Sequence, residues 1–580
     1  MEEYRNPFEY EAASKLTPHQ LLEYYIEDFN YSRFVRSKRN VFLVGERGTG
    51  KTMALRYHSL PVYVLQQKKK DDELDLSIIS VYVPCNTPLT HRREYELLDQ
   101  LNASLSSEHF LVLSIMDRII ESLSEINEFL TSDDEDHLRG ELSYLLNLEI
   151  PVNVPFFRAL RLAFGKSSSD AQRALNTKTD AESSLRNLLS FTSGLLPLLT
   201  CLAHLPKLSN SHFSLMLDDV QYFNPYQIKA MNSWISYRDN SLFSFKVATT
   251  RVEYPTLETS SGGCILEGHD FTRLDMEQPY QNKTSAFAKM AREIISRRLA
   301  TIAVGKTPEE YFPLSAEMAQ DIENAEAQAR EEADEKFPTG TTKQKDDYIY
   351  KYARAIYFRN RASKANLPPY SGFEVLVHMS TGVIRNLLDP CYYMYDAMYS
   401  QWHAESREGK PIFDSIPSSV QTQVILSRST KKWELTKGEL DKTIDDCSRE
   451  DARRVYQLLD NLAILFRARL LSEISEPRAV SFTISNFTHD LQAKLEPVLT
   501  VARKAQLIYV YTSSGKDLGR REVYYMPNRM LWPVRGLDPI GQHARVSIRA
   551  EHLWNAADKN KKIPFNEKEE IDEPTLFDFT

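Results

Sequence analysis

The sequence predicts an α/β fold with a parallel sheet core, a helical insertion in that core, and a smaller α+β domain near the C-terminus. Three observations lead to this prediction. A short apolar run at 41–44 leads directly into a glycine-rich turn and then into a helical pattern. Further strand-like runs occur at 77–83, 213–217 and 243–249, with helical patterns between them. The chain of 580 residues also exceeds what one hydrophobic core can hold.

The order of these patterns predicts four successive parts: an α/β core, a helical region with a linker, an α+β domain and an acidic tail. We place them at 1–310, 311–445, 446–563 and 564–580. The core contains a helical insertion at about 88–205, because the stretch from Phe110 to Phe129 repeats apolar residues at three- and four-residue spacing. In the second part, the acidic stretch 316–336 has few large apolar residues and indicates a solvated helix.

Composition excludes several classes of protein. The net charge of −9 argues against a general nucleic-acid coat, although it leaves room for a local basic surface. The five cysteines are far apart and form no C-x-x-C pair, which points to the cytoplasm and gives no zinc-ribbon spacing. The acidic start MEEYRNPFEY does not have the pattern of a signal peptide. The apolar stretch 187–206 contains Pro197 and His204, so we expect a buried helix there and no membrane span.

The most specific motif is GERGTGKT, from Gly45 to Thr52, between a strand pattern and a helical pattern. It fits G-x-x-x-x-G-K-[ST], in which the glycines let backbone N–H groups approach phosphate oxygens. Lys51 would reach the β- and γ-phosphates of a nucleoside triphosphate, and the Thr52 hydroxyl would bind Mg²⁺. The residues expected to contact the nucleotide are Gly45, Glu46, Arg47, Gly48, Thr49, Gly50, Lys51, Thr52 and Met53.

A P-loop of this kind needs a second strand that carries carboxylates for the metal and the attacking water. The sequence FSLMLDDV offers one, because an apolar run precedes Asp218 and Asp219. Asp218 would bind Mg²⁺, directly or through water. Asp219 would orient a water molecule for in-line attack on the γ-phosphate. A pair of turn aspartates after a buried strand is the alternative interpretation.

Two further polar groups follow in the chain. The strand pattern FSFKVATT ends at Arg251, and this residue, Thr249 or Thr250 could sense the γ-phosphate from a neighbouring strand tip. Farther on, HMSTGVIRNLLD places Arg385 three residues after Gly382, at the start of a helix. An arginine there could reach from a helical lid to the phosphates and couple the nucleotide to the position of the lid. A structural role of each group remains the alternative.

The order of these four motifs resembles the AAA+ and STAND branches of the P-loop ATPases. GERGTGKT looks most like the origin-recognition-type (initiator) AAA+ ATPases, whereas LMLDDV followed by KVATTR is similar to the NB-ARC type of STAND switches. The resemblance implies a Walker A motif from Gly45 to Thr52, a Walker B motif at Asp218 and Asp219, and ATP as the nucleotide. It also implies sensor 1 at or near Arg251, sensor 2 at Arg385 and a helical lid at 311–445. It covers residues 1–400.

The chain departs from this pattern in two respects. Asp218 follows Lys51 by 167 residues, which is far longer than a minimal ATPase core requires and implies the inserted helical subdomain. Asp219 replaces the usual Glu, and its shorter side chain would position water less well. Both departures favour slow hydrolysis, or use of ATP as a conformational latch.

Other P-loop classes fit less well. The ABC-type signature precedes the second carboxylate strand, whereas the similar string here, SSGG from Ser260 to Gly263, follows it. The GTPase motif N-K-x-D has only a distant counterpart in NTKTD, from Asn176 to Asp180, with the wrong spacing and order. ATP is therefore favoured over GTP.

The C-terminal region predicts a winged-helix-like domain, since helical patterns precede two strand patterns that could form a ribbon. Residues 499–563 contain twelve Lys and Arg against five Asp and Glu. Aromatic and basic residues alternate there, which would suit contact with duplex DNA but would equally suit a basic face over core aromatics. They are Tyr509, Tyr511, Lys516, Arg520, Arg521, Tyr524, Tyr525, Arg529 and Trp532.

Two functional hypotheses follow. The first is an ATP-dependent switch that hydrolyses ATP slowly, associates with DNA and works with a separate effector protein in replication, mobile-element maintenance or antiviral defence. The second is a STAND-like signalling scaffold that senses a protein ligand and oligomerises without binding DNA. The sequence leaves open whether the chain forms a homo-oligomer, and it predicts no enzymatic effector domain within the chain.

Overall fold

The computed structural model describes most of the chain, and the account below refers to those residues alone. They are 6–9, 13–27, 31–85, 94–95, 98–177, 187–237, 241–251, 254–276, 285–302, 304–363, 367–405, 411–473, 478–514, 521–541 and 545–565. The chain divides into two compact units, one formed by Glu11–Glu277 and the other by Met1–Tyr10 together with Gln278–Thr580. The division therefore precedes the expected boundary at 310, and the first ten residues group with the later part of the chain.

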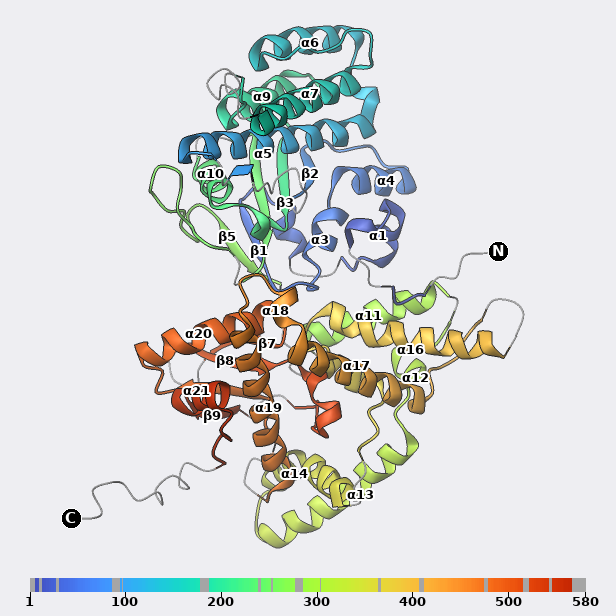
Figure 1. Cartoon of the computed structure of the whole chain (residues 1–580). Helices are drawn as coiled ribbons and strands as arrows, with labels where there is room; N and C mark the ends of the chain where they lie inside the picture. The colour runs from blue at the N-terminus through green and yellow to red at the C-terminus, as the bar shows by residue number, and fades with distance from the viewer. Residues whose placement is uncertain are drawn as a thin grey trace, which may run out of the picture. The chain divides into compact units, whose positions relative to one another are not determined.

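A five-stranded parallel sheet forms the centre of the first unit (Figure 1). Its strand order is β2-β3-β4-β1-β5. The strands are β1 (Val41–Val44), β2 (Ile78–Pro84), β3 (His212–Asp218), β4 (Phe243–Thr249) and β5 (Thr272–Asp275). All neighbours are parallel, so the carboxyl ends of the strands share one edge. In the register, Val44 pairs with Thr249, and Pro84 pairs with Asp218.

The side chains of β1 alternate between two hydrophobic clusters, as expected for a strand covered on both faces. Phe42 and Val44 belong to a large cluster that also contains α5 residues such as Leu111. Val41 and Leu43 belong to a second cluster under the helices near the N-terminus of this unit. The helices of the unit are α1 (Pro18–Tyr24), α2 (Ser32–Val35), α3 (Lys51–Tyr57), α4 (Leu60–Lys70), α5 (Gln100–Leu123), α6 (Ser132–Leu146), α7 (Phe156–Thr177), α9 (Leu196–His204) and α10 (Pro225–Ile235).

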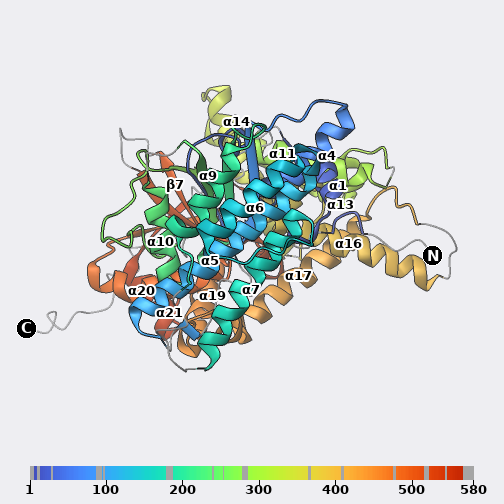
Figure 2. The ribbon, with the colours of Figure 1, turned by 90° about the horizontal axis from the view of Figure 1, so that it is seen from above.

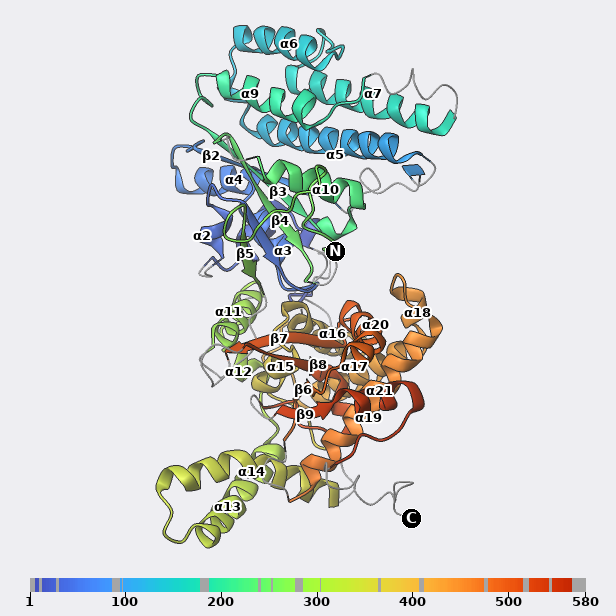
Figure 3. The same ribbon diagram turned by 90° about the vertical axis from the view of Figure 1, so that its left-hand side faces the viewer.

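The predicted helical insertion is present as α5, α6, α7 and α9, which run side by side over one face of the sheet (Figures 2 and 3). It shares the large hydrophobic cluster with the sheet, because buried residues of α5 and α9 lie in the same cluster as β2 and β3. The insertion is therefore a layer of the same core. The apolar stretch near Pro197 forms a π-helical turn, Phe191–Leu195, that runs into α9. Among the described residues, no helix is long and apolar enough to cross a membrane.

The second unit begins with helices and ends with a mixed sheet. Its helices are α11 (Ala286–Ala300), α12 (Pro308–Tyr311), α13 (Ala316–Lys336), α14 (Thr342–Ser363), α15 (Phe373–Met379), α16 (Ile384–Ala404), α17 (Ser418–Gly438), α18 (Leu440–Thr443), α19 (Arg449–Leu471), α20 (His489–Lys504) and α21 (Ala550–Lys559). The acidic stretch 316–336 forms α13, which pairs with α14 in a hairpin (Figure 3). Ala325, Ala329 and Ala333 are buried at four-residue spacing, and this stripe lets the helices approach closely.

The second sheet has the order β7-β8-β6-β9, with β6 (Ser481–Ser485), β7 (Ile508–Ser514), β8 (Arg521–Pro527) and β9 (Arg545–Arg549). The β7–β8 ribbon is antiparallel, as the sequence predicted, whereas β6 and β9 add a parallel pair beside it. Helices α19, α20 and α21 pack around this sheet, an arrangement consistent with a winged helix. The fold class is thus the predicted one, an α/β core with a helical insertion, followed by helices and an α+β domain.

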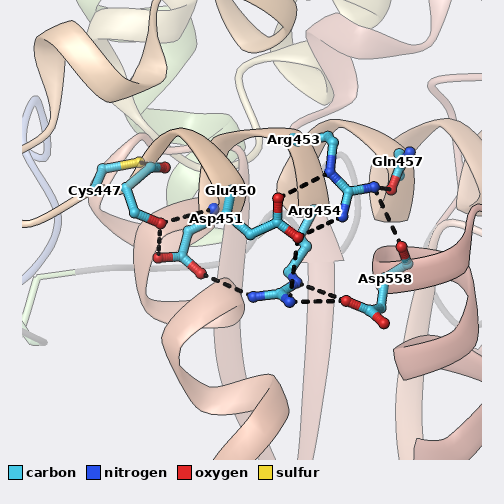
Figure 4. A network of polar contacts seen from close by, with 8 residues as sticks. Cys447, Glu450, Asp451, Arg453, Arg454, Gln457 and Asp558 are labelled. Atoms are coloured by element: carbon cyan, nitrogen blue, oxygen red, sulfur yellow. Dashed lines mark hydrogen bonds and ion pairs between the residues drawn. The ribbon is translucent and has the colours of Figure 1, made fainter.

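An ion-pair network joins the first and last helices of this α+β domain (Figure 4). Arg454 on α19 donates from Nε and Nη2 to the Asp558 carboxylate of α21, at 3.0 and 2.8 Å. The Arg454 guanidinium also lies 3.3 Å from a Glu450 oxygen and stacks over the Trp554 ring. The bidentate geometry fixes α21 against α19.

Candidate nucleotide site

The glycine-rich turn lies between β1 and α3, at the carboxyl edge of the parallel sheet. Gly48 and Gly50 have φ values of 92° and 98°, in the region that favours glycine. Gly45 is needed for a different reason, because a Cβ there would lie 2.9 Å from Thr49 Oγ1 and 3.2 Å from Met276 Cβ. The sequence thus folds into the compact loop that the motif predicted.

The Lys51 side chain folds back into this loop. Its ammonium group donates to the carbonyl oxygens of Gly45 and Glu46, at 2.6 and 3.0 Å, and the residue is 6% exposed. Thr49 Oγ1 donates to the Glu46 carbonyl at 2.9 Å and closes the turn. The positive charge is therefore held within the loop that is expected to surround the phosphates. The other expected contacts, Arg47 and Met53, lie in or next to the loop, with the Arg47 guanidinium over the Tyr222 ring.

Asp218 is the last residue of β3 and is 2% exposed. Its Oδ2 accepts a hydrogen bond from the Tyr82 hydroxyl of β2 at 2.9 Å, whereas Oδ1 is buried and, within the described residues, has no hydrogen-bond partner. The pKa of Asp218 is raised to about 6, first by burial and then by the negative charge of Asp219. The hydroxyls of Thr52 and Tyr82 offset part of this rise in the pKa.

Asp219 differs from its neighbour in backbone and exposure. Its φ of 59° lies in the left-handed region, which Asp tolerates better than most residues. The backbone leaves the strand here, and Asp219 lies half-buried at the start of a short 3₁₀ turn, Val220–Tyr222. Gln221 Nε2 donates to Asp219 Oδ1 at 3.1 Å. The two aspartates are thus adjacent in the chain but occupy different environments at the sheet edge.

The tip of β4 lies directly beside the loop, because the Gly45 amide donates to the Thr249 carbonyl at 3.3 Å. Thr249 and Thr250 are buried, at 1% and 2% exposure. Arg251 follows them and forms an ion pair with Asp275 at the end of β5. The three expected sensor residues therefore lie at the carboxyl edge of the sheet.

Arg385 belongs to the second unit, as the second residue of α16, and its side chain is exposed. The turn before it is buried, and Thr381 and Gly382 have positive φ values of 55° and 81°. Thr381 accepts at its carbonyl from the Tyr511 hydroxyl at 3.0 Å, and Asn386 Nδ2 donates to the Tyr509 hydroxyl at 2.9 Å. The start of α16 is thus fixed to β7 of the α+β domain.

The structure corrects the expectation that the C-terminal aromatic and basic residues form one DNA-contacting surface. Tyr509, Tyr511, Tyr524 and Trp532 are buried. The Arg529 guanidinium is 2% exposed and donates to the carbonyl oxygens of Pro539 and Gly541, at 2.9 Å each. These residues form core, because each ring is covered by the helices and by neighbouring strands. The basic residues Lys516 and Arg520 lie outside the described residues, as does the acidic tail from 566 onward.

The residues at the sheet edge fit Mg²⁺ bound together with a nucleotide. Asp218 offers a buried carboxylate oxygen without a hydrogen-bond partner, and the Thr52 hydroxyl lies near enough to this carboxylate to affect its pKa. Mg²⁺ usually takes one or two protein oxygens and completes its shell with phosphate oxygens and water. No group of three or more His, Cys, Asp or Glu side chains that could hold a metal by itself occurs among the described residues.

Tyr82 is the residue at this site that the sequence did not single out. It lies 136 positions before Asp218 in the chain, and the parallel register of β2 and β3 brings the two together. The run SIISVYV did predict a strand, but only the pairing of that strand with FSLMLDD shows where the tyrosine hydroxyl lies. A polar side chain near the end of a strand was the available signal.

Comparisons with known proteins agree with the motifs. No match is found among curated proteins. One similar solved structure is that of Cdc6p from Pyrobaculum aerophilum, with 13% sequence identity, coverage of 96% of this chain and 97% of that chain, and a TM-score of 0.28, which is too low to bear on the fold. The family described as ORC-CDC6-like matches at residues 6–339 and 321–548, almost the whole chain. The chain therefore belongs to the ORC-CDC6-like family, the origin-recognition type of AAA+ ATPase.

Proposed function

We propose that this protein binds ATP with Mg²⁺ between the P-loop and Asp218, hydrolyses it slowly, and uses the bound nucleotide as a switch. The observation that carries the proposal is the environment of Asp218. A buried carboxylate with one oxygen lacking a hydrogen-bond partner, close to the hydroxyl that follows Lys51, suits a cation held between protein and phosphate. Family membership supports an ATPase of this class.

The residues take separate roles in the proposal. Lys51 binds the β- and γ-phosphates, Thr52 and Asp218 hold Mg²⁺, and Asp219 orients the attacking water. Mg²⁺ would neutralise charge on the phosphate oxygens when bound. Arg251 would contact the γ-phosphate from the tip of β4, although its ion pair with Asp275 would first have to open.

Slow turnover follows from Asp219. A glutamate at this position would extend one methylene farther, whereas Asp219 is short and already accepts a hydrogen bond from Gln221. Water held less firmly for in-line attack reacts less often, because alignment supplies much of the rate enhancement. A long-lived ATP-bound state would suit a switch better than a motor.

The switching element in this proposal is the turn that precedes α16. Arg385 projects from the turn, and two hydrogen bonds from tyrosines of β7 and the buried Val383 fix the turn to the α+β domain. Contact of Arg385 with the nucleotide would therefore bias the position of the α+β domain as well as that of the lid. The partners proposed for that domain are duplex DNA and a separate effector protein. Replication, mobile-element maintenance and antiviral defence all fit this scheme.

Binding of labelled duplex DNA, measured by fluorescence anisotropy at low and at moderate salt, tests the DNA part of the proposal. We expect binding that weakens steeply as salt rises and that differs between ATP and no nucleotide, since phosphate contacts release counterions. Lys51→Ala should remove the difference between nucleotide states without removing binding itself. If no DNA binds at low salt in any nucleotide state, the DNA part fails and a signalling scaffold that oligomerises is favoured.

Arg385→Ala tests the switch. We expect tight ATP binding to weaken and the nucleotide dependence of DNA binding to be lost. Arg297→Ala is a matched control, because Arg297 is an exposed arginine of α11 paired only within its helix environment with Glu293 at 2.9 Å. The same ATP affinity and turnover in Arg385→Ala as in the parent protein would remove Arg385 from the switch.

A further inference from the structure

We propose that Tyr82 is a positioning residue for the metal site: its hydroxyl holds one oxygen of Asp218 so that the other is directed to Mg²⁺. The inference rests on the proposed ATP·Mg²⁺ site and adds a residue to it. Tyr82 belongs to none of the P-loop, Walker B or sensor motifs, and it would not touch phosphate or metal itself.

The contact between β2 and the end of β3 fixes the aspartate at two points. The Tyr82 hydroxyl donates to Asp218 Oδ2 at 2.9 Å, and the Cys85 amide donates to the Asp218 carbonyl at 2.9 Å. Both donors come from the same strand, one from a side chain and one from the backbone. The carboxylate therefore cannot rotate about its Cβ–Cγ bond without breaking the tyrosine hydrogen bond. Its other oxygen, Oδ1, remains buried without a hydrogen-bond partner among the described residues.

Tyr82 is in turn held by the helix that carries the Thr52 hydroxyl. Arg56 lies one helical turn after Thr52 on α3, so the two side chains share a face of that helix. The Arg56 guanidinium carbon lies 5.8 Å from the centre of the Tyr82 ring, and the guanidinium donates to the Ala13 carbonyl. The helix thus brings Thr52 to the metal side of Asp218 and packs Arg56 against the tyrosine.

A tyrosine is chemically suited to this position. Burial and the nearby Asp218 charge raise the pKa of Tyr82 far above its usual value, so the hydroxyl keeps its proton and donates throughout the physiological range. A neutral donor fixes the carboxylate without cancelling its charge, whereas an arginine or lysine in the same place would compete with the cation. Hydrogen bonds of this kind, from a second residue to a metal ligand, commonly change metal affinity by about 10–100-fold when removed.

Tyr82→Phe tests the proposal, because it removes the hydroxyl and keeps the ring. The full-length protein is titrated with Mn²⁺, a spectroscopic substitute for Mg²⁺, in the presence of ATP, and free Mn²⁺ is followed by electron paramagnetic resonance. ATP affinity is measured separately in EDTA. We expect Mn²⁺ affinity to fall about tenfold or more and ATP affinity in EDTA to stay the same. An Mn²⁺ affinity within twofold of the parent value, or an equal loss of ATP affinity in EDTA, would overturn the proposal.

Two controls separate positioning from a general loss of packing. Tyr254→Phe removes a tyrosine hydroxyl of the same unit that donates to Asn232 Oδ1 at 2.6 Å, away from the sheet edge, and it should leave Mn²⁺ affinity unchanged. An equal loss in this variant would contradict the specific role of Tyr82. In Asp218→Asn, the added Tyr82→Phe change should weaken Mn²⁺ binding by less than twofold, because the tyrosine acts through the aspartate. A further tenfold loss there would also contradict it. If the parent protein binds no Mn²⁺ with ATP, the proposed function itself fails.

Discussion

Asp218 and Asp219 are neighbours in the chain, but their environments give them different roles. Asp218 ends a buried strand and is 2% exposed, whereas Asp219 turns into a left-handed backbone conformation and lies half-buried. Burial suits a carboxylate that is neutralised by a cation, and partial exposure suits one that contacts water. The assignment of metal binding to the first and water orientation to the second follows from this difference.

Asp219→Asn is expected to retain ATP binding and to lower turnover by at least about 100-fold, since the amide is a poor acceptor for the proton of the attacking water. Steady-state phosphate release and ATP affinity, measured on the same preparation, check this. Asp71→Asn is the matched control, because Asp71 is an exposed aspartate of the same unit with a similar left-handed φ of 56°. Unchanged hydrolysis in Asp219→Asn would falsify the water-orienting role.

The raised pKa of Asp218 predicts a pH dependence of stability with an unusual sign. The folded protein holds this proton up to about pH 6, whereas the unfolded chain releases it near pH 3.8. The contribution of the group to stability is therefore full below about pH 3.8 and is lost as pH rises through about 6. Asp218→Asn should raise the Tm of the ligand-free protein near neutral pH, and the gain should shrink in acid.

Thermal unfolding of the ligand-free protein at neutral and acidic pH measures this effect. Asp72→Asn, which changes an exposed aspartate of the same unit, serves as the control and should leave the Tm unchanged at both pH values. An Asp218→Asn protein that is less stable than the parent at neutral pH would show that the carboxylate is already well compensated without a ligand.

At the scale of elements, the apolar runs of the sequence located four of the five strands of the parallel sheet. The fifth, β5 with the sequence TRLD, was not predicted, because an edge strand with alternating exposure lacks an apolar run. The same reason explains β6 and β9, whose sequences SFTIS and RVSIR are short and polar. Short strands of this kind are defined by their partners, which are distant in the chain.

The candidate site was predictable where it is local and obscure where it depends on pairing. The P-loop is contiguous, so its eight residues were recognisable together. Tyr82 was not, because its role depends on strand register across 136 positions. The C-terminal basic and aromatic pattern was ambiguous in sequence, since the same alternation describes a DNA surface or a covered core. For Arg529 the structure decides for the core, because backbone carbonyls accept from its guanidinium.

The contact between α19 and α21 carries a prediction at this scale. Asp558→Ala should lower the free energy of unfolding of the α+β domain by about 1 kcal/mol, because it leaves Arg454 without its bidentate partner. Lys494→Ala breaks only an exposed pair with Asp490 within α20 and should cost about 0.5 kcal/mol or less. Urea unfolding followed by tryptophan fluorescence compares the two. Equal small losses would show that the network adds nothing beyond ordinary surface pairs.

At the scale of the whole molecule, the chain consists of two compact units, and the candidate site residues are divided between them. The P-loop, both aspartates and Arg251 belong to one unit, whereas Arg385 belongs to the other. A nucleotide that contacts both would favour one arrangement of the units by its difference in affinity for the alternatives. The start of α16 would pass that bias to the α+β domain through the hydrogen bonds of Thr381 and Asn386.

ATP binding in the presence of Mg²⁺, measured by isothermal titration calorimetry, tests the central claim most directly. The parent protein and Lys69→Ala, which removes an exposed lysine of α4, should bind ATP with the same Kd. Lys51→Ala should bind at least about 100-fold more weakly, because charge-assisted hydrogen bonds to phosphate contribute about 1.5–3 kcal/mol each. ATP binding by Lys51→Ala with the Kd of the parent protein would contradict the account.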